Sequence, residues 1–341
     1  MKHFPPLLAA LACLLAISCA QTSGPRPDFR KLITPARVSL APQLASLPAT
    51  NGIAQFHFSF ATDATQRVTG ILLKAERSRG RRPVVIALHG TGGSKGNMQS
   101  LCRKLAGKGF VAVAIDGPYH GERRSAGKGT EEYQAAILRA WQTPGEHPLY
   151  YDTVGDVMRL VDYLQTRKDV DPGRIGLIGI SKGGIESYLA AALDERIAVV
   201  VSCIGVQSFR WALANNAWQA RIGTIGPAFA AAAKEAGVGQ PDAAFAKTFY
   251  DRVVPGIYGA YDGPAMLPLI APRPLLVINS DSDSLTPLPG LKECTDAAQP
   301  VYGAAGVEDR FVVRIQENTG HQVTPESERA AIEWFVKWLK P

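Results

Sequence analysis

The apolar positions of the chain follow one pattern before residue 83 and another after it. Upstream, residues 55–60 and 68–74 are short strand-like runs, and Phe56, Phe58 and Phe60 share one face of the first run by alternation. The turn-forming sequence TDAT separates the two runs. This pattern predicts an antiparallel pair of strands.

Downstream, short runs rich in β-branched residues alternate with helical patterns. Val154, Val157, Val161 and Leu164 recur at helical spacing, and Thr324 followed by Pro325 has the features of a capped helix start. Unbroken apolar runs are typical of strands buried on both faces of a mainly parallel sheet. The order therefore predicts a doubly wound α/β sheet. Its strands are expected at residues 84–88, 111–115, 175–178, 199–203, 275–278 and 311–315.

One stretch interrupts this alternation. Residues 205–272 separate two of the expected strands, which is far longer than an ordinary connection through one helix. The stretch holds Trp211, Trp218 and an alanine-rich helical segment at 230–236. We interpret it as a cap over the end of the sheet. Packing within the cap is the favoured role for the two tryptophans, and lining a substrate pocket is the alternative.

The first residues have the pattern of an export signal. Lys2 and His3 precede an apolar run too short to span a bilayer, and Ser18-Cys19-Ala20 supplies small residues for cleavage. Residues 1–20 are therefore expected to be a signal peptide. Cys19 also permits a lipoprotein interpretation, with membrane attachment through a lipid. The protein would be periplasmic, secreted or lipid-anchored in the cell envelope. Residues 21–50 show no sustained periodicity and are expected to form a linker that leads into the folded domain, residues 51–341.

Composition limits the classes of function. The 341 residues are 46% hydrophobic and 20% charged, which excludes a disordered or coiled-coil protein. The net charge of +7 arises from scattered basic residues, and this favours solvated loops over a nucleic-acid surface. Cys102, Cys203 and Cys294 are too far apart to form a CxxC pair, so a zinc or thioredoxin-like site is not expected. The nucleophilic serine chemistry considered below needs no metal and no cofactor. The composition gives no oligomeric state.

The strongest chemical motif is Gly179-Ile180-Ser181-Lys182-Gly183. It directly follows the expected strand at 175–178 and precedes a helical stretch, the context that a nucleophile elbow requires. A second copy, Gly92-Gly93-Ser94-Lys95-Gly96, begins only after a loop. We therefore take Ser181 as the nucleophile candidate and give the second copy another role.

The partners of a nucleophilic serine are expected in the order serine, acid, histidine. His321 is the histidine that follows the late strands, and it lies in a loop just after the strand at 311–315. The loop after residues 275–278 contains Asp281 and Asp283, and either carboxylate could orient the histidine. Asp283 is favoured.

An oxyanion would need two backbone N–H groups. One is expected from Lys182, the residue after the nucleophile. The other is expected from the glycine-rich loop that follows residues 84–88, with Thr91 as first choice and Gly92 as second. His120 and Asp116, in a later loop, are interpreted as structural.

The stretches PVVIALHGTGG, AIDGPYHGER, RIGLIGISKGG, IAPRPLLVINSDSDSLTP and ENTGHQ carry a resemblance. With them the chain resembles the α/β-hydrolases, closest to the dienelactone hydrolase and acetyl xylan esterase-like serine hydrolases. The resemblance implies an α/β-hydrolase fold and a small-molecule ester substrate cleaved through an acyl-enzyme. It also implies that Asp283, before a spacer and Thr-Pro, is the triad acid. Lys182 departs from the residues more frequent after the nucleophile.

Other functions remain open at this stage. A peptidase of the prolyl-oligopeptidase kind shares the machinery, but the residues before the core are too few for its usual extra domain. An acyl thioesterase of the same superfamily and a non-catalytic binding protein on a hydrolase scaffold are the further alternatives. A nucleotide-binding protein is disfavoured, because neither GxxxxGK[ST] nor GxGxxG occurs.

Overall fold

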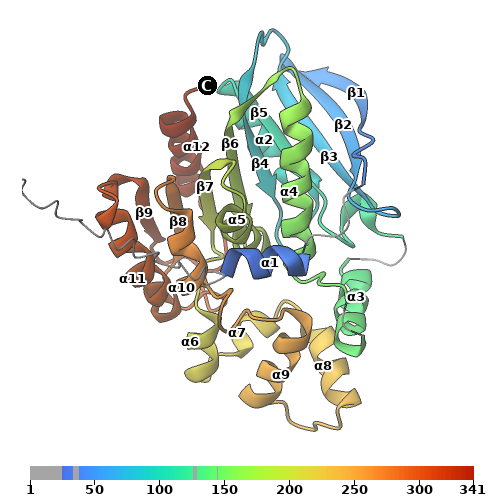
Figure 1. Cartoon of the computed structure of the whole chain (residues 1–341), viewed down its shortest axis with the longest axis vertical. Coiled ribbons are helices and arrows are strands. Elements are labelled where there is room, and N and C mark those ends of the chain that lie inside the picture. Colours follow the sequence, from blue (N-terminus) through green and yellow to red (C-terminus); the bar gives the residue numbers. More distant parts are fainter. Residues whose placement is uncertain (1–24, 34–37, 126–128, 144) are drawn as a thin grey trace, which may run out of the picture.

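The computed structural model describes residues 25–33, 38–125, 129–143 and 145–341. The expected signal peptide and Cys19 lie outside these residues. In the described part, nine strands form one sheet in the order β1-β2-β3-β5-β4-β6-β7-β8-β9, with helices on both faces (Figure 1). The strands are β1 (Gln43–Thr50), β2 (Ile53–Ala61), β3 (Arg67–Ala75), β4 (Arg82–Leu88), β5 (Val111–Ile115), β6 (Val170–Ile180), β7 (Ile197–Cys203), β8 (Leu275–Ser280) and β9 (Phe311–Gln316).

The first part of the sheet is antiparallel. β1, β2 and β3 pair in sequence, and β3 pairs antiparallel with β5. Phe58 and Phe60 are fully buried on the face of β2 that alternation predicts, and Phe56 is half-buried. Gly70 on β3 lies opposite Phe58, whose ring fills the space where a side chain would stand. The predicted antiparallel pair is confirmed.

All strand pairs from β5 to β9 are parallel, as predicted. Alternate residues of the central strands belong to two separate apolar clusters, one on each face of the sheet. One cluster includes α2 (Gln99–Gly107) and α12 (Pro325–Leu339), and the other includes α4 (Tyr151–Thr166) and α5 (Lys182–Leu193). Thr324 caps α12 by accepting the Ser327 N–H at 3.2 Å. Within the described residues, no helix is both long and apolar enough to cross a bilayer.

β9 differs from the prediction that its apolar run is buried on both faces. Val312, Val313 and Ile315 are 37–38% exposed. The reason is its position, because β9 is the last strand of the sheet and has a neighbour on only one side. An apolar run in sequence does not distinguish an edge strand from a central one.

Residues 21–50 contain regular structure that the sequence pattern did not predict. α1 (Pro25–Ile33) buries Phe29 and Ile33, which lie one helical turn apart. β1 is exposed along its whole length and includes Pro48, so it has no apolar alternation to detect. Its order comes from backbone pairing with β2 at the edge of the sheet.

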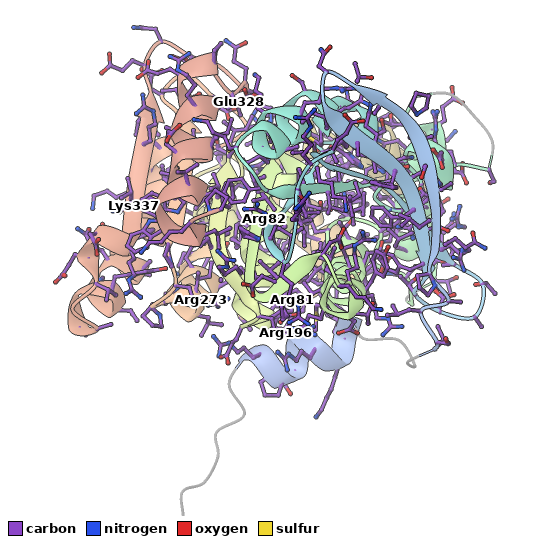
Figure 2. The ribbon with its side chains drawn as sticks, turned by 90° about the horizontal axis from the view of Figure 1, so that it is seen from above. Arg81, Arg82, Arg196, Arg273, Glu328 and Lys337 are labelled. Atoms are coloured by element: carbon purple, nitrogen blue, oxygen red, sulfur yellow. The ribbon has the colours of Figure 1, made fainter. Side chains whose placement is uncertain are left out.

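Arginine side chains bind the carboxyl end of α5. Arg26 Nε on α1 donates to Ala192 O at 2.8 Å, and Arg273 Nη2 donates to Ala191 O at 2.7 Å. Arg30 donates to Leu193 O. Arg196 and Arg273 lie on the side of the molecule where α1 packs (Figure 2). Arg26, Arg30 and Arg273 donate to the last carbonyl groups of α5, at the negative end of its dipole. They therefore fix the helix that follows the nucleophile candidate.

The segment between β7 and β8 forms short helices beyond the end of the sheet (Figure 1). Trp218 packs against Phe229 with ring centroids 5.9 Å apart. Gln134, on α3, donates to Thr224 O at 3.2 Å and accepts the Ala228 N–H at 3.2 Å, which ties the segment to the body. The helices are α6 (Phe209–Ala214), α7 (Gln219–Ile222), α8 (Gly226–Glu235), α9 (Ala243–Val253) and α10 (Gly263–Met266). Of these, α8 and α9 pack against α3 (Glu131–Gln142).

Candidate active site

Ser181 occupies a sharp turn between β6 and α5. Its backbone has φ 58° and ψ −113°, a conformation that is strained for a residue with a side chain. The turn requires close backbone approaches, since a Cβ on Gly179 would lie 1.8 Å from Gly183 O. A Cβ on Gly183 would lie 2.5 Å from Leu88 O on the neighbouring strand. The two glycines of the motif are thus required because a side chain at either position would clash with the neighbouring backbone.

Three side chains from separate loops form a hydrogen-bonded series. His321 Nε2 lies 2.6 Å from Ser181 Oγ, and His321 Nδ1 lies 2.7 Å from Asp283 Oδ2. The three residues follow β6, β8 and β9, whose parallel carboxyl ends meet at one edge of the sheet. An imidazole protonated on Nδ1 donates to Asp283 and accepts the Ser181 hydroxyl proton.

Asp283 is held as an ionised acceptor. Its side chain is fully buried and accepts from Thr286 Oγ1 at 2.6 Å and the Leu285 N–H at 2.8 Å. Burial opposes ionisation of the carboxyl group, but the hydrogen bonds from His321 and Thr286 outweigh it and lower its pKa below the usual value. Asp281, the alternative acid, instead accepts the Asn318 N–H at 2.8 Å.

The glycine-rich loop after β4 lies against the nucleophile candidate. A Cβ on Gly90 would be 3.4 Å from Ser181 Cβ. Within the described residues, the N–H groups of Thr91 and Lys182 have no acceptor. The Gly92 N–H donates to His120 Nε2 at 3.2 Å. Of the predicted donors, Thr91 and Lys182 are therefore free to bind an oxyanion, and Gly92 is engaged.

The contacts of His120 agree with its interpretation as a structural residue. It is 2% exposed, and its Nδ1 donates to Pro118 O at 2.8 Å while Nε2 accepts from Gly92. Burial, then the Lys182 ammonium and His89, lower the pKa of His120 to about 3. The neutral His120 ring thus joins the glycine-rich loop after β4 to the loop after β5.

His89 makes a second connection of the same kind. Its Nδ1 donates to Gly90 O at 2.8 Å, and its Nε2 accepts the Gly117 N–H at 3.0 Å. Burial and then the Lys182 charge lower the pKa of His89 to about 4. In both imidazoles Nε2 accepts a backbone N–H. Protonation at Nε2 would remove that acceptor and break a hydrogen bond that holds the glycine-rich loop.

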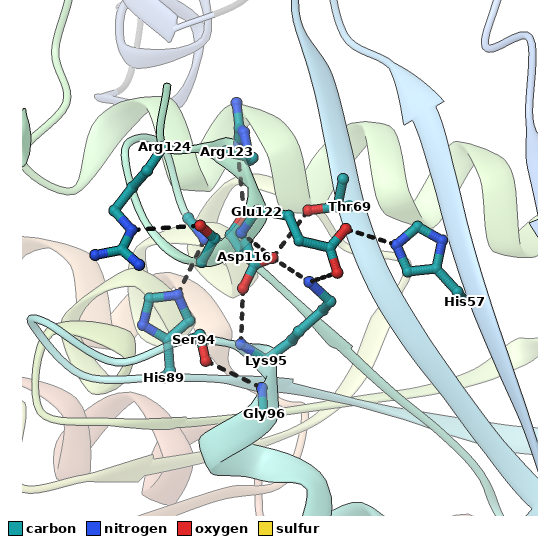
Figure 3. Close-up of polar contacts among 12 residues, drawn as sticks. His57, Thr69, His89, Ser94, Lys95, Gly96, Asp116, Glu122, Arg123 and Arg124 are labelled. Carbon is teal, nitrogen blue, oxygen red and sulfur yellow. Dashed lines mark hydrogen bonds and ion pairs between the residues drawn. The ribbon is translucent and has the colours of Figure 1, made fainter. Parts of the chain in front are cut away.

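An ionic cluster lies at the end of the glycine-rich loop after β4, around Lys95 (Figure 3). The Lys95 ammonium pairs with buried Asp116 and lies 2.8 Å from Glu122. Asp116 also accepts from Thr69 Oγ1 at 2.9 Å, and Glu122 lies 2.7 Å from His57 Nε2. Burial raises the pKa of Asp116, but the Lys95 and Thr69 donors more than offset this and lower it below the usual value. The interpretation of Asp116 as a loop-fixing residue agrees with these contacts.

The Lys182 side chain is a buried cation directly after the nucleophile candidate. It is 2% exposed, pairs with Glu186 and lies 3.3 Å from Thr153 Oγ1. Burial raises the pKa of Glu186, and Lys182 counters that effect. Sequence reasoning used only the backbone of Lys182; the i,i+4 spacing to Glu186 was the available signal for the pair.

The described residues contain no group of three or more His, Cys, Asp or Glu side chains placed to hold a metal ion. Cys102, Cys203 and Cys294 are buried as free thiols. For Cys102 and Cys203, burial raises the thiol pKa to about 12, so neither is a ready nucleophile.

Known proteins are similar to this chain in sequence and in fold. The Bacillus subtilis (strain 168) protein YtaP, named as a hydrolase, is 27% identical over 287 residues, which cover 80% of this chain and 84% of that protein. Acetyl xylan esterase 1 from Thermoanaerobacterium sp. JW/SL YS485 superimposes with a TM-score of 0.68 at 15% identity, covering 92% of both chains. Methylesterase BT1017 superimposes with a TM-score of 0.65 at 21% identity, over 93% of this chain and 63% of that one.

Two family models match parts of the chain. The fungal glucuronyl esterase model matches residues 154–306. The acetyl xylan esterase (AXE1) model matches residues 34–210, just over half of the chain. With its nine-strand mixed sheet and this match, the protein belongs to the acetyl xylan esterase (AXE1) family and is an α/β-hydrolase that cleaves carboxylic esters.

Proposed function

We propose that the protein is a serine carboxylesterase in which Ser181, His321 and Asp283 form the catalytic triad. The observation that carries this proposal is the series of two short hydrogen bonds, 2.6 Å from Ser181 Oγ to His321 Nε2 and 2.7 Å from His321 Nδ1 to Asp283 Oδ2. That geometry lets the imidazole take the hydroxyl proton while the buried carboxylate stabilises the resulting imidazolium.

The reaction then follows from the geometry in two transfers. Ser181 Oγ attacks the ester carbonyl carbon as His321 Nε2 takes its proton. His321 returns the proton to the alcohol oxygen as the ester bond breaks, which leaves an acyl group on Ser181. Water, deprotonated by the same nitrogen, attacks the acyl carbon. His321 then returns that proton to Ser181 Oγ as the bond between Ser181 and the acyl group breaks, which releases the acid.

Thr91 and Lys182 are the proposed oxyanion donors. Their N–H groups lack acceptors within the described residues, and the adjacent Gly90 lies against Ser181. Lys182 N–H also begins α5, so the positive end of the helix dipole faces the same place. The neutral His89 and His120 hold the loop in this position before substrate binds.

For the substrate, we propose a small acyl ester, with acetyl as the reference group. The support is the family, whose name refers to acetyl esters of xylan. For location, we propose export, supported by the apolar run at residues 7–17 and the small residues that follow it. Whether Cys19 carries a lipid would be read from the mass of the mature amino terminus.

The test compares the wild-type protein with Ser181→Ala. Both are assayed on 4-nitrophenyl acetate and butyrate, and both are treated with a fluorophosphonate probe. The proposal expects hydrolysis and labelling by the wild type and loss of both in the variant, with an unchanged far-ultraviolet circular dichroism spectrum. A folded wild type that neither reacts with the probe nor hydrolyses the esters would refute it.

A further inference from the structure

Arg221 is a buried cation in the cap that has no acidic partner. It lies on α7 and is 3% exposed, and no carboxylate of the described residues lies within ion-pair distance of it. Its Nη2 donates to Gly205 O at 3.3 Å. With the Gln207 amide oriented so that its donors and acceptors are both satisfied, Arg221 Nε also donates to Gln207 Oε1 at 2.9 Å. A guanidinium has five N–H donors, so these two acceptors leave most of its donors unused.

The buried carboxylates on the surrounding elements are committed elsewhere. Asp262 accepts from Ser208 Oγ at 3.0 Å and from the N–H groups of Phe209 at 2.7 Å and Gly263 at 2.8 Å. Glu186, on α5, pairs with Lys182. Burying an arginine without a counter-charge is costly, because the two acceptors of Arg221 replace only part of the hydration that burial removes.

The surroundings of Arg221 include tyrosine hydroxyl groups that are neutral. The hydroxyl of Tyr188 is buried and has no hydrogen-bond partner within the described residues. Burial raises the pKa of Tyr188 well above its usual value, and Arg221 acts on it in the opposite direction. Tyr150 also interacts with Arg221, and burial raises its pKa to about 12. A buried cation and a buried hydroxyl group without a partner among the described residues therefore lie close enough to interact electrostatically.

This region is connected to the proposed active site from two sides. Gly205, which accepts from Arg221, lies two residues after Cys203, whose carbonyl accepts the Ser181 N–H at 2.9 Å. On the other side, Gln207 Nε2 donates to Leu285 O at 3.0 Å, and Leu285 N–H donates to Asp283. Arg221 is therefore only a few contacts from both the nucleophile and the acid.

We propose that Arg221 binds a carboxylate carried by the ester substrate, so that the enzyme selects esters whose acyl or alcohol part is anionic. The inference rests on the proposed function and names the substrate class of that same site. The planar guanidinium fork suits a carboxylate in a bidentate arrangement. Such a ligand would supply the counter-charge that the described residues do not provide.

The test uses two matched substrate pairs. For the acyl side, mono-4-nitrophenyl glutarate is compared with neutral 4-nitrophenyl valerate. For the alcohol side, 4-acetoxybenzoate is compared with its methyl ester. We expect kcat/KM of the wild type to favour the anionic member of at least one pair by about tenfold or more. Arg221→Gln should remove that preference, lowering kcat/KM for the anionic member about tenfold more than for the neutral member.

Two controls separate a specific contact from general attraction. Arg210→Gln removes an exposed positive charge from α6 in the same cap and should leave the preference intact. The preference should also persist in about 0.5 M salt, which screens the long-range field of a protein with net charge +7. Arg221→Lys keeps the charge without the fork and should retain part of the preference.

The outcomes distinguish the two proposals. A wild type that hydrolyses neutral esters but shows no preference in either pair overturns the carboxylate site and leaves the esterase function standing. An equal loss on both members in a folded Arg221→Gln variant also overturns it. If that variant does not fold, glutarate and benzoate must inhibit neutral-ester hydrolysis by the wild type more strongly than by Arg221→Lys. A wild type with no hydrolysis and no fluorophosphonate labelling refutes the esterase function itself.

Discussion

The same five-residue pattern, Gly-x-Ser-Lys-Gly, occurs twice in the chain and folds in two different ways. At residues 179–183 it follows a buried strand, and Ser181 is forced to a positive φ of 58° with His321 2.6 Å from its Oγ. At residues 92–96 it follows a loop, and Ser94 has extended backbone with φ −156°. The chemistry of the pattern therefore depends on the strand before it and on the partners it meets.

The second copy has a structural task. Ser94 Oγ accepts the Gly96 N–H at 3.2 Å and caps the short helix η1 (Lys95–Met98) in a reciprocal arrangement with Asn97. Lysine occupies the fourth position of both copies, and each lysine is buried in an ion pair, Lys182 with Glu186 and Lys95 with Asp116. Both loops are held by buried charge, but only one presents its serine to a base.

The largest effect on activity is expected at Asp283, which contacts His321, in comparison with Asp281, which contacts the Asn318 loop. Asp283→Asn keeps the shape but removes the charge that stabilises the imidazolium, so kcat should fall about 10³–10⁴-fold on 4-nitrophenyl acetate. Asp281→Asn, two residues away, loses only acceptors for the loop at Asn318 and should stay within about threefold of the wild type. Equal losses in both variants would remove Asp283 from the triad.

Most of the sheet could be predicted because its strands are unbroken apolar runs. The run at 111–115 coincides with β5, and the others fall inside their strands, since burial on two faces leaves a strong signal. β1 could not be found this way, because it is exposed and is ordered by backbone pairing alone. The exposure of β9 depends on strand order, which periodicity does not contain.

The candidate site divides along the same line. Ser181 and His321 could be predicted from chain order, because each follows a strand that ends at the same edge of the sheet. Chain order leaves Asp281 and Asp283 open, and the family resemblance favours Asp283. The contacts that His120 and Arg221 make could not be predicted, since they join segments distant in sequence. Local sequence patterns indicate which residues have suitable chemistry, and the tertiary contacts determine which of them form the site.

The fifth position of the two copies offers a second test. In Gly183→Ala, the new methyl group would lie 2.5 Å from Leu88 O, so the free energy of unfolding should fall by about 3 kcal/mol or more. In Gly96→Ala, the nearest atom is Ser94 Oγ at 3.3 Å, and the loss should be below about 1 kcal/mol. Urea denaturation measures both values. Similar losses would contradict a space requirement specific to the elbow.

The histidines between the two loops make stability depend on pH. The folded pKa of His120, about 3, lies below the unfolded value, so its contribution is complete above about pH 6.5 and is lost as pH falls towards the folded pKa. Between about pH 7 and pH 5 the loss should be about 2 kcal/mol in the free energy of unfolding. The His120→Asn variant should not show this part of the loss of stability between about pH 7 and pH 5.

The comparison of slopes must allow for a second group that titrates in the same pH range. Asp152, whose pKa is raised to about 7 by burial and by Asp156, acts in the opposite sense and is present in every variant, so only differences between proteins are interpreted. Parallel slopes for wild type and His120→Asn would show that this ring does not titrate as the structure implies.

The smallest effect is expected at the serine of the second copy. Ser94→Ala removes the cap of η1, so the free energy of unfolding should fall by about 1 kcal/mol, and Ser94→Thr should restore most of it. Because no base contacts this serine, kcat/KM and fluorophosphonate labelling should match the wild type. A loss of activity above about tenfold in Ser94→Ala, at unchanged Ser181 labelling, would show that η1 positions the oxyanion loop as strictly as the elbow positions Ser181.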